Sequence, residues 1–61
     1  MMVNQYDGVR LKDGRDGCIV EVLKPGIAYY LDVGAGTPED PWDGFDIRHE
    51  DIAEVTYRHT V

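Results

Sequence analysis

The sequence is poor in cysteine, in long apolar runs and in basic residues, and each shortage excludes a class of protein. The one cysteine, Cys18, cannot form an internal disulfide, whereas small domains of oxidising compartments usually carry several. No apolar run approaches the roughly 20 residues that span a bilayer, and the first residues lack the basic and apolar regions of a secretion signal. We therefore expect a cytoplasmic protein that does not enter a membrane.

The short length of the chain limits its architecture. The 61 residues make one domain, 1–61, whose ordered core we expect at about 6–58. At this size about 60% of the surface of the unfolded chain is buried on folding, so a deep cavity would hollow out the core. A groove, a sheet edge or a surface patch is therefore the expected form of any binding site.

Negative charge is the most informative bulk property. Twelve acidic and six basic residues give a net charge of −6, and seven of the acids with one base lie between Glu39 and Glu54. Nucleic-acid affinity comes largely from cations that displace counterions, so we expect no nucleic-acid partner. An acidic face instead attracts a basic partner at long range. The alternative is that the excess acid serves solubility alone.

Alternating apolar and polar residues, separated by turn residues, predict five short strands. Asp13-Gly14 supplies a tight turn after the first strand, and Pro25-Gly26 supplies a turn whose glycine accepts a positive φ. The side chains expected to face the core in the later strands include Tyr29, Leu31, Val33, Phe45 and Ile47. The expected strands are residues 9–12, 18–23, 28–33, 45–48 and 53–57.

The connections complete the predicted fold. Residues 34–41, rich in glycine and proline, form the long loop, and residues 49–52 suit one 3₁₀ turn. A helix over 46–58 is the competing interpretation, because neither glycine nor proline interrupts that stretch. Its apolar residues do not keep helical spacing, and its tail is rich in β-branched residues. We therefore predict an all-β fold, a small five-stranded barrel with one short 3₁₀ turn before the last strand.

The stretch LKDGRDG, residues 11–17, contains two Asp-Gly pairs and raises the question of a phosphate-binding loop. Such loops present backbone N–H groups at the start of a helix, whereas Gly17 leads into an expected strand. Three cations surround the turn, and three aspartates beside them cancel most of their field. We expect the glycines to shape turns.

The order of these segments resembles a known family. VRLKDGRDGCIVEVL, a Pro-Gly turn, AYYLDV and FDIRHEDIAEV follow one another as in the small bacterial SH3-like barrels, which are close to KOW-type domains and to a family of stand-alone domains of unknown function. The resemblance covers roughly residues 6–55 and implies a five-stranded SH3-like barrel with a binding or accessory role beside toxin-like proteins. KOW-type relatives contact ribosomes or RNA through basic loops, but the long loop is acidic here, so we do not expect that role.

Residue types of nucleophilic catalysis are present without a pattern that supports it. Cys18, His49 and Asp51 include the types of a triad, but nothing in their spacing argues for contact. Cys18 lies in an apolar strand and is expected to be a structural thiol. We therefore predict that the protein is not an enzyme and needs no cofactor.

Metal-ligating residue types are also present without a convincing spacing. His49-Glu50 lacks the second histidine of a helical zinc motif. Asp40, Asp43 and Asp46 match a calcium loop in composition, but their spacing of three fails its alternate-position pattern. We expect no metal, with a weak cation site at these aspartates as the alternative.

Trp42, flanked by acidic residues, is the most informative single residue. Tryptophan is enriched at binding hot spots, and the acids around it offer partners to arginine or lysine. The alternative is that Trp42 covers the open end of the barrel. We predict a protein-binding module, such as an immunity or antitoxin-like partner, that docks a basic protein of the nuclease-like toxin kind. The expected binding residues are Glu39, Asp40, Trp42, Asp43 and Asp46.

A second hypothesis is a structural role in assembly. An open edge strand or an aromatic face formed by Tyr6, Tyr30 and Tyr57 would pair with its own copy to make a homo-oligomer. Such pairing would supplement a core that is small for independent stability.

Overall fold

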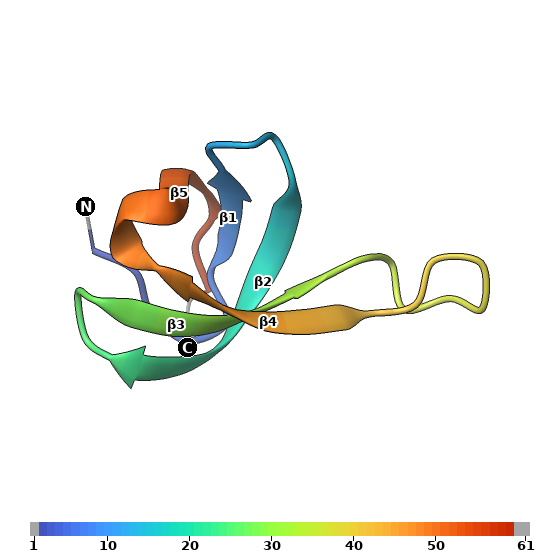
Figure 1. Ribbon diagram of the computed structural model, residues 1–61, viewed down its shortest axis with the longest axis horizontal. Coiled ribbons are helices and arrows are strands. Elements are labelled where there is room, and N and C mark those ends of the chain that lie inside the picture. The colour runs from blue at the N-terminus through green and yellow to red at the C-terminus, as the bar shows by residue number, and fades with distance from the viewer. Residues whose placement is uncertain (1, 60–61) are drawn as a thin grey trace.

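The computed structural model describes residues 2–59, which form one antiparallel β-sheet (Figure 1). A 3₁₀ turn, η1 (His49–Asp51), precedes the last strand. The prediction of an all-β fold with five strands and one 3₁₀ turn before the last strand is confirmed. The strands are β1 (Gly8–Leu11), β2 (Asp16–Lys24), β3 (Ala28–Val33), β4 (Asp43–Arg48) and β5 (Ile52–Tyr57).

The strand order is β4-β3-β2-β1-β5, so the chain runs along the sheet and then returns to pair β5 with β1. The sheet is strongly curved, and β3 and β4 lie crosswise to β1 and β5 in Figure 1. Within the described residues β4 and β5 are the two edges, and no backbone pairing joins them. The sheet is therefore open.

The two predicted turns adopt the backbone conformations that their glycines permit. Gly14 has φ of 95° and Gly26 has φ of 74°, both in the region that favours glycine. The N–H of Ile27 donates to the carbonyl of Lys24 at 2.9 Å and closes the second turn. These two hairpins set the register of β2 against β1 and β3.

The core lies on one face of the sheet and includes residues that alternation predicted. Tyr29 and Leu31 are fully buried, Ile47 is buried, and Val33 and Phe45 pack against them half-buried. The helix considered over 46–58 does not form, because that stretch supplies β4, η1 and β5. The buried apolar residues are Val3, Val9, Leu11, Ile19, Tyr29, Leu31, Ile47 and Ile52.

A buried carboxylate ties the two ends of the described chain together. Asp7 is 0% exposed and accepts hydrogen bonds from the backbone N–H of Asn4 at 2.9 Å and of His59 at 3.0 Å. Arg58 Nη1 lies 3.3 Å from the same carboxylate and donates to the Met2 carbonyl at 2.6 Å. We call this set the terminal clasp. It orders residues on either side of the expected 6–58 core, including buried Val3.

Candidate functional site: an acidic arm and the hollow beside it

The connection between β3 and β4 protrudes from the body of the sheet (Figure 1). We call residues 34–43 the acidic arm. Its acids, Glu39, Asp40 and Asp43, are all exposed, and its sequence contains no lysine or arginine. The arm therefore carries three acidic side chains and no basic one at one end of the molecule.

Asp40 organises the arm from within. Its carbonyl oxygen accepts the N–H groups of Ala35, Gly36 and Thr37 at 3.0 to 3.2 Å, and its carboxylate accepts the N–H of Ala35 at 3.1 Å. Its own N–H donates to the hydroxyl and the carbonyl of Thr37, each at 3.1 Å. From the sequence, Asp40 was expected to bind a partner or, in the alternative, a cation, and its role in holding the loop was not foreseen. The sequence signal that could have predicted this turn is a threonine, Thr37, three residues before the aspartate.

Two glycines let the sides of the arm approach each other. Gly34 has φ of 107°, and a β-carbon there would lie 2.6 Å from the carbonyl oxygen of Pro41. A β-carbon on Gly36 would lie 2.7 Å from Cε2 of Trp42, so the indole packs directly on this glycine. Trp42 is nevertheless 69% exposed and does not belong to the core. Trp42 therefore does not cover the end of the sheet, as the alternative interpretation of the sequence expected.

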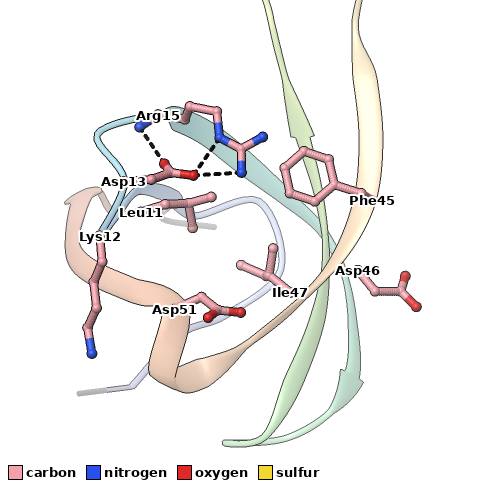
Figure 2. A pocket seen from close by; sticks show the side chains of 8 residues that line it. All are labelled: Leu11, Lys12, Asp13, Arg15, Phe45, Asp46, Ile47 and Asp51. Carbon is pink, nitrogen blue, oxygen red and sulfur yellow. Dashed lines mark hydrogen bonds and ion pairs between the residues drawn. The ribbon is translucent and has the colours of Figure 1, made fainter.

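The structure brings four of the five predicted binding residues together. Glu39, Asp40, Trp42 and Asp43 lie on the acidic arm or at its base. Asp46 lies farther along β4, opposite Tyr30 of β3, and points away from the neighbouring groove in Figure 2. Asp46 is exposed and adds to the charge of β4 without belonging to the arm.

The groove drawn in Figure 2 lies between the β1–β2 turn and β4, and Arg15, one of its two cations, is already paired. Arg15 Nη2 lies 2.7 Å from the carboxylate of Asp13, and the guanidinium lies 4.7 Å from the ring centre of Phe45. The hydrogen bond raises the pKa of Arg15 and lowers the pKa of Asp13. Arg10 is likewise held by Asp16 at 3.0 Å and Glu54 at 2.6 Å. The two arginines at this turn are therefore paired within the chain.

A second depression, which we call the outer hollow, adjoins the acidic arm on the face of β2 and β3 opposite the core. Its volume is about 470 Å³. Trp42 forms one wall, Cys18 and Val20 supply apolar surface, and Asp32 supplies a carboxylate. The lining residues are Asp16, Gly17, Cys18, Val20, Asp32, Gly34 and Trp42. Sequence reasoning missed this hollow because its residues come from three separate segments.

The surroundings of Cys18 in the outer hollow disfavour ionisation of its thiol. Burial raises the pKa of Cys18, and the nearby charges of Asp32 and Asp7 raise it further. Asp32 is the cross-strand partner of Cys18 in the pairing of β2 with β3. The thiolate is the reactive form of cysteine, so the folded chain lowers the reactive fraction of Cys18 below that of an unperturbed cysteine.

We expect the alkylation of Cys18 by iodoacetamide to depend on pH with a midpoint above that of the urea-unfolded chain. A raised pKa delays thiolate formation, so the rate in the folded chain rises only at higher pH. Asp32→Asn removes one cause of the raised pKa and should move the midpoint down. Asp46→Asn, on an exposed carboxylate outside the hollow, is the matched control. Identical midpoints for the folded and unfolded chains would contradict this account.

The triad types named in the sequence are not brought together. His49 Nδ1 lies 2.7 Å from the hydroxyl of buried Tyr29, and the carboxylate of Asp51 accepts the N–H of Arg48 at 2.9 Å. Cys18 lies on β2 in the outer hollow. His49 therefore ties η1 to buried Tyr29 of β3, and Asp51 caps the start of η1. Among residues 2–59 no three His, Cys, Asp or Glu side chains are grouped to hold a metal ion.

The three tyrosines proposed as an aromatic face lie on different parts of the sheet. Tyr30 is on β3 and Tyr57 is on β5, and β2 and β1 separate these strands in the sheet order. Tyr6 precedes β1 and its ring meets His59 edge-on, with centroids 5.5 Å apart. The sheet order therefore does not gather the three side chains into one face.

The fold and the site together define a small all-β domain with a protruding acidic arm. Comparison of the chain with protein-family models, curated proteins and solved structures found no match. None of the helical segments in the described part of the chain is long and apolar enough to cross a membrane.

Proposed function

We propose that this chain is a non-catalytic protein-binding module whose acidic arm docks a basic protein. The observation that carries the proposal is the exposed indole of Trp42, 69% accessible, among the acids of an arm without any basic residue. Uniform negative charge steers a basic partner by raising its association rate. An exposed tryptophan then supplies the apolar anchor that is typical of binding hot spots.

The internal hydrogen bonds of the arm support this proposal. Asp40 and Thr37 fix the loop, and Gly36 holds the indole of Trp42 in place. A loop that is ordered before binding loses less conformational entropy on association than a flexible one. More of the interaction energy then appears as affinity.

The proposed partner is a protein that is basic because it holds nucleic acid, such as a nuclease-like toxin. This chain would then act as an immunity or antitoxin-like protein, without contacting nucleic acid itself. We also propose that the curved sheet is an SH3-like barrel. The return of β5 to pair with β1 and the position of η1 before β5 support that assignment.

We expect Glu39→Lys/Asp43→Lys to weaken binding to the basic partner at least about tenfold, and salt to weaken the parent complex steeply. Asp40 is left unchanged because its carboxylate accepts the N–H of Ala35 and a substitution there would disturb the loop. The matched control is Glu21→Lys/Glu50→Lys, which changes the net charge equally at exposed positions on β2 and η1.

The measurement begins with capture of partners from the source lysate at low and high salt. The association rate of the captured protein with each purified variant is then measured over a range of salt concentrations. A partner that binds the arm variant as well as the parent, or whose rate does not respond to salt, would rule out docking through the acidic arm. An assembly role, the alternative, would have to use the sheet edges at β4 and β5 instead.

A further inference from the structure

The outer hollow places two carboxylates around an apolar floor. Asp16 and Cys18 are alternate residues of β2, so their side chains project from the same face. Asp32 pairs with Cys18 across the two strands. Asp16 is therefore the diagonal neighbour of Asp32 across the two strands, and such neighbours lie about 7–8 Å apart.

The two carboxylates differ in how their charge is compensated. Asp16 accepts a hydrogen bond from Arg10 Nε at 3.0 Å, and that arginine also bonds Glu54. Asp32, half-buried, has no ion pair or hydrogen-bond partner for its carboxylate among residues 2–59. Its charge also contributes to the raised pKa of Cys18. The hollow therefore holds an uncompensated negative charge beside apolar surface.

The third component of the hollow is the indole of Trp42, which forms its wall on the side of the acidic arm. An indole face attracts a cation, most often arginine, by its quadrupole. Carboxylates accept the N–H groups of a guanidinium in charge-assisted hydrogen bonds. One planar cation can satisfy both kinds of contact at once.

We propose that the outer hollow is a socket for an arginine side chain of the basic partner. This inference rests on the proposed function. It specifies which side chain of the partner binds to the sheet beside the acidic arm. The planar guanidinium stacks on Trp42 and directs its N–H donors toward Asp32, while its methylene stem lies over Cys18 and Val20. Lysine presents a compact charge with three donors, and it cannot stack in this way.

The test uses the full chain and a defined probe, the peptide acetyl-Gly-Arg-Gly-amide. Trp42 is the one tryptophan in the sequence, so its fluorescence reports on the wall of the hollow directly. We expect a saturable change with the arginine peptide. The matched peptide with citrulline, which is neutral and nearly isosteric, should give no saturable change, and the lysine peptide should bind more weakly. Comparing the peptides on the parent chain requires no variant to fold.

Variants then locate the bound arginine. We expect Asp32→Asn to weaken the arginine peptide at least about fivefold, as the loss of one partly exposed charge pair implies. Asp16→Asn should weaken it less, because Arg10 already compensates Asp16. Glu50→Gln changes the net charge equally at an exposed position of η1 outside the hollow and should leave the affinity unchanged. Urea unfolding of each variant verifies that it folds.

Three results would overturn the socket. They are equal binding of the arginine and citrulline peptides, equal effects of Asp32→Asn and Glu50→Gln, and self-association of the chain that blocks peptide binding. If the socket fails while Glu39→Lys/Asp43→Lys still abolishes salt-dependent capture, the proposed function stands without it. If Asp32→Asn weakens the peptide while the arm variant captures its partner normally, the socket stands and docking through the arm fails.

Discussion

Asp7→Ala should lower the free energy of unfolding by about 3 kcal/mol and the melting temperature by more than about 10 °C. The carboxylate is fully buried and accepts hydrogen bonds from two backbone N–H groups and from Arg58. Removing one partner of a buried pair typically costs about 3–5 kcal/mol. We take the lower end because Arg58 is half-exposed and can be solvated when the carboxylate is lost.

Urea unfolding followed by Trp42 fluorescence or circular dichroism measures this effect, and one further clasp variant and one exposed carboxylate supply the controls. Arg58→Ala should cost about 1 kcal/mol, because Asp7 keeps both of its backbone donors. Asp46→Ala, at an exposed carboxylate, should stay within about 0.5 kcal/mol of the parent. An Asp7→Ala variant as stable as Asp46→Ala would show that the clasp does not stabilise the fold.

Gly17→Ala should lower the free energy of unfolding by about 2 kcal/mol, although alanine normally stabilises by restricting the unfolded chain. A β-carbon at Gly17 would lie 2.7 Å from the carbonyl oxygen of Asp32 and 2.8 Å from Cδ1 of buried Leu31. The carbonyl cannot move without disturbing the pairing of β2 with β3, which joins Gly17 to Val33. The steric overlap should cost about 3 kcal/mol, the upper end of the range for overpacking. This cost outweighs the entropic gain of about 0.4–1 kcal/mol from alanine.

Gly14 provides the matched control for this overlap. It has φ of 95°, but no atom lies within 4 Å of a β-carbon added there. Gly14→Ala therefore reports backbone strain alone, which we expect to cost about 1 kcal/mol. Unfolding of both variants in urea separates the two causes. If Gly17→Ala is no less stable than the parent, the close approach of β2 to β3 is not as the structure describes it.

The acidic arm could be predicted in part from the sequence. The glycines and prolines of 34–41 identified the long loop, and the acids beside Trp42 identified a candidate surface. Only the structure shows the role of each acid. Asp40 holds the turn together by hydrogen bonds, and Asp46 lies on β4 outside the arm. Composition identifies which charges are available, but it does not separate those that face solvent from those used in hydrogen bonds.

The sequence by itself determined the strands and their connections. Alternation of apolar residues fixed the buried face of β3, and Gly14 and Gly26 fixed two turns, because these are local properties of the backbone. Only the tertiary structure decided the terminal clasp, which joins Asp7 to His59 across 52 residues, and the outer hollow, which joins β2, β3 and the arm. Such contacts depend on how a curved sheet folds back on itself, and no local pattern records which distant side chains then meet.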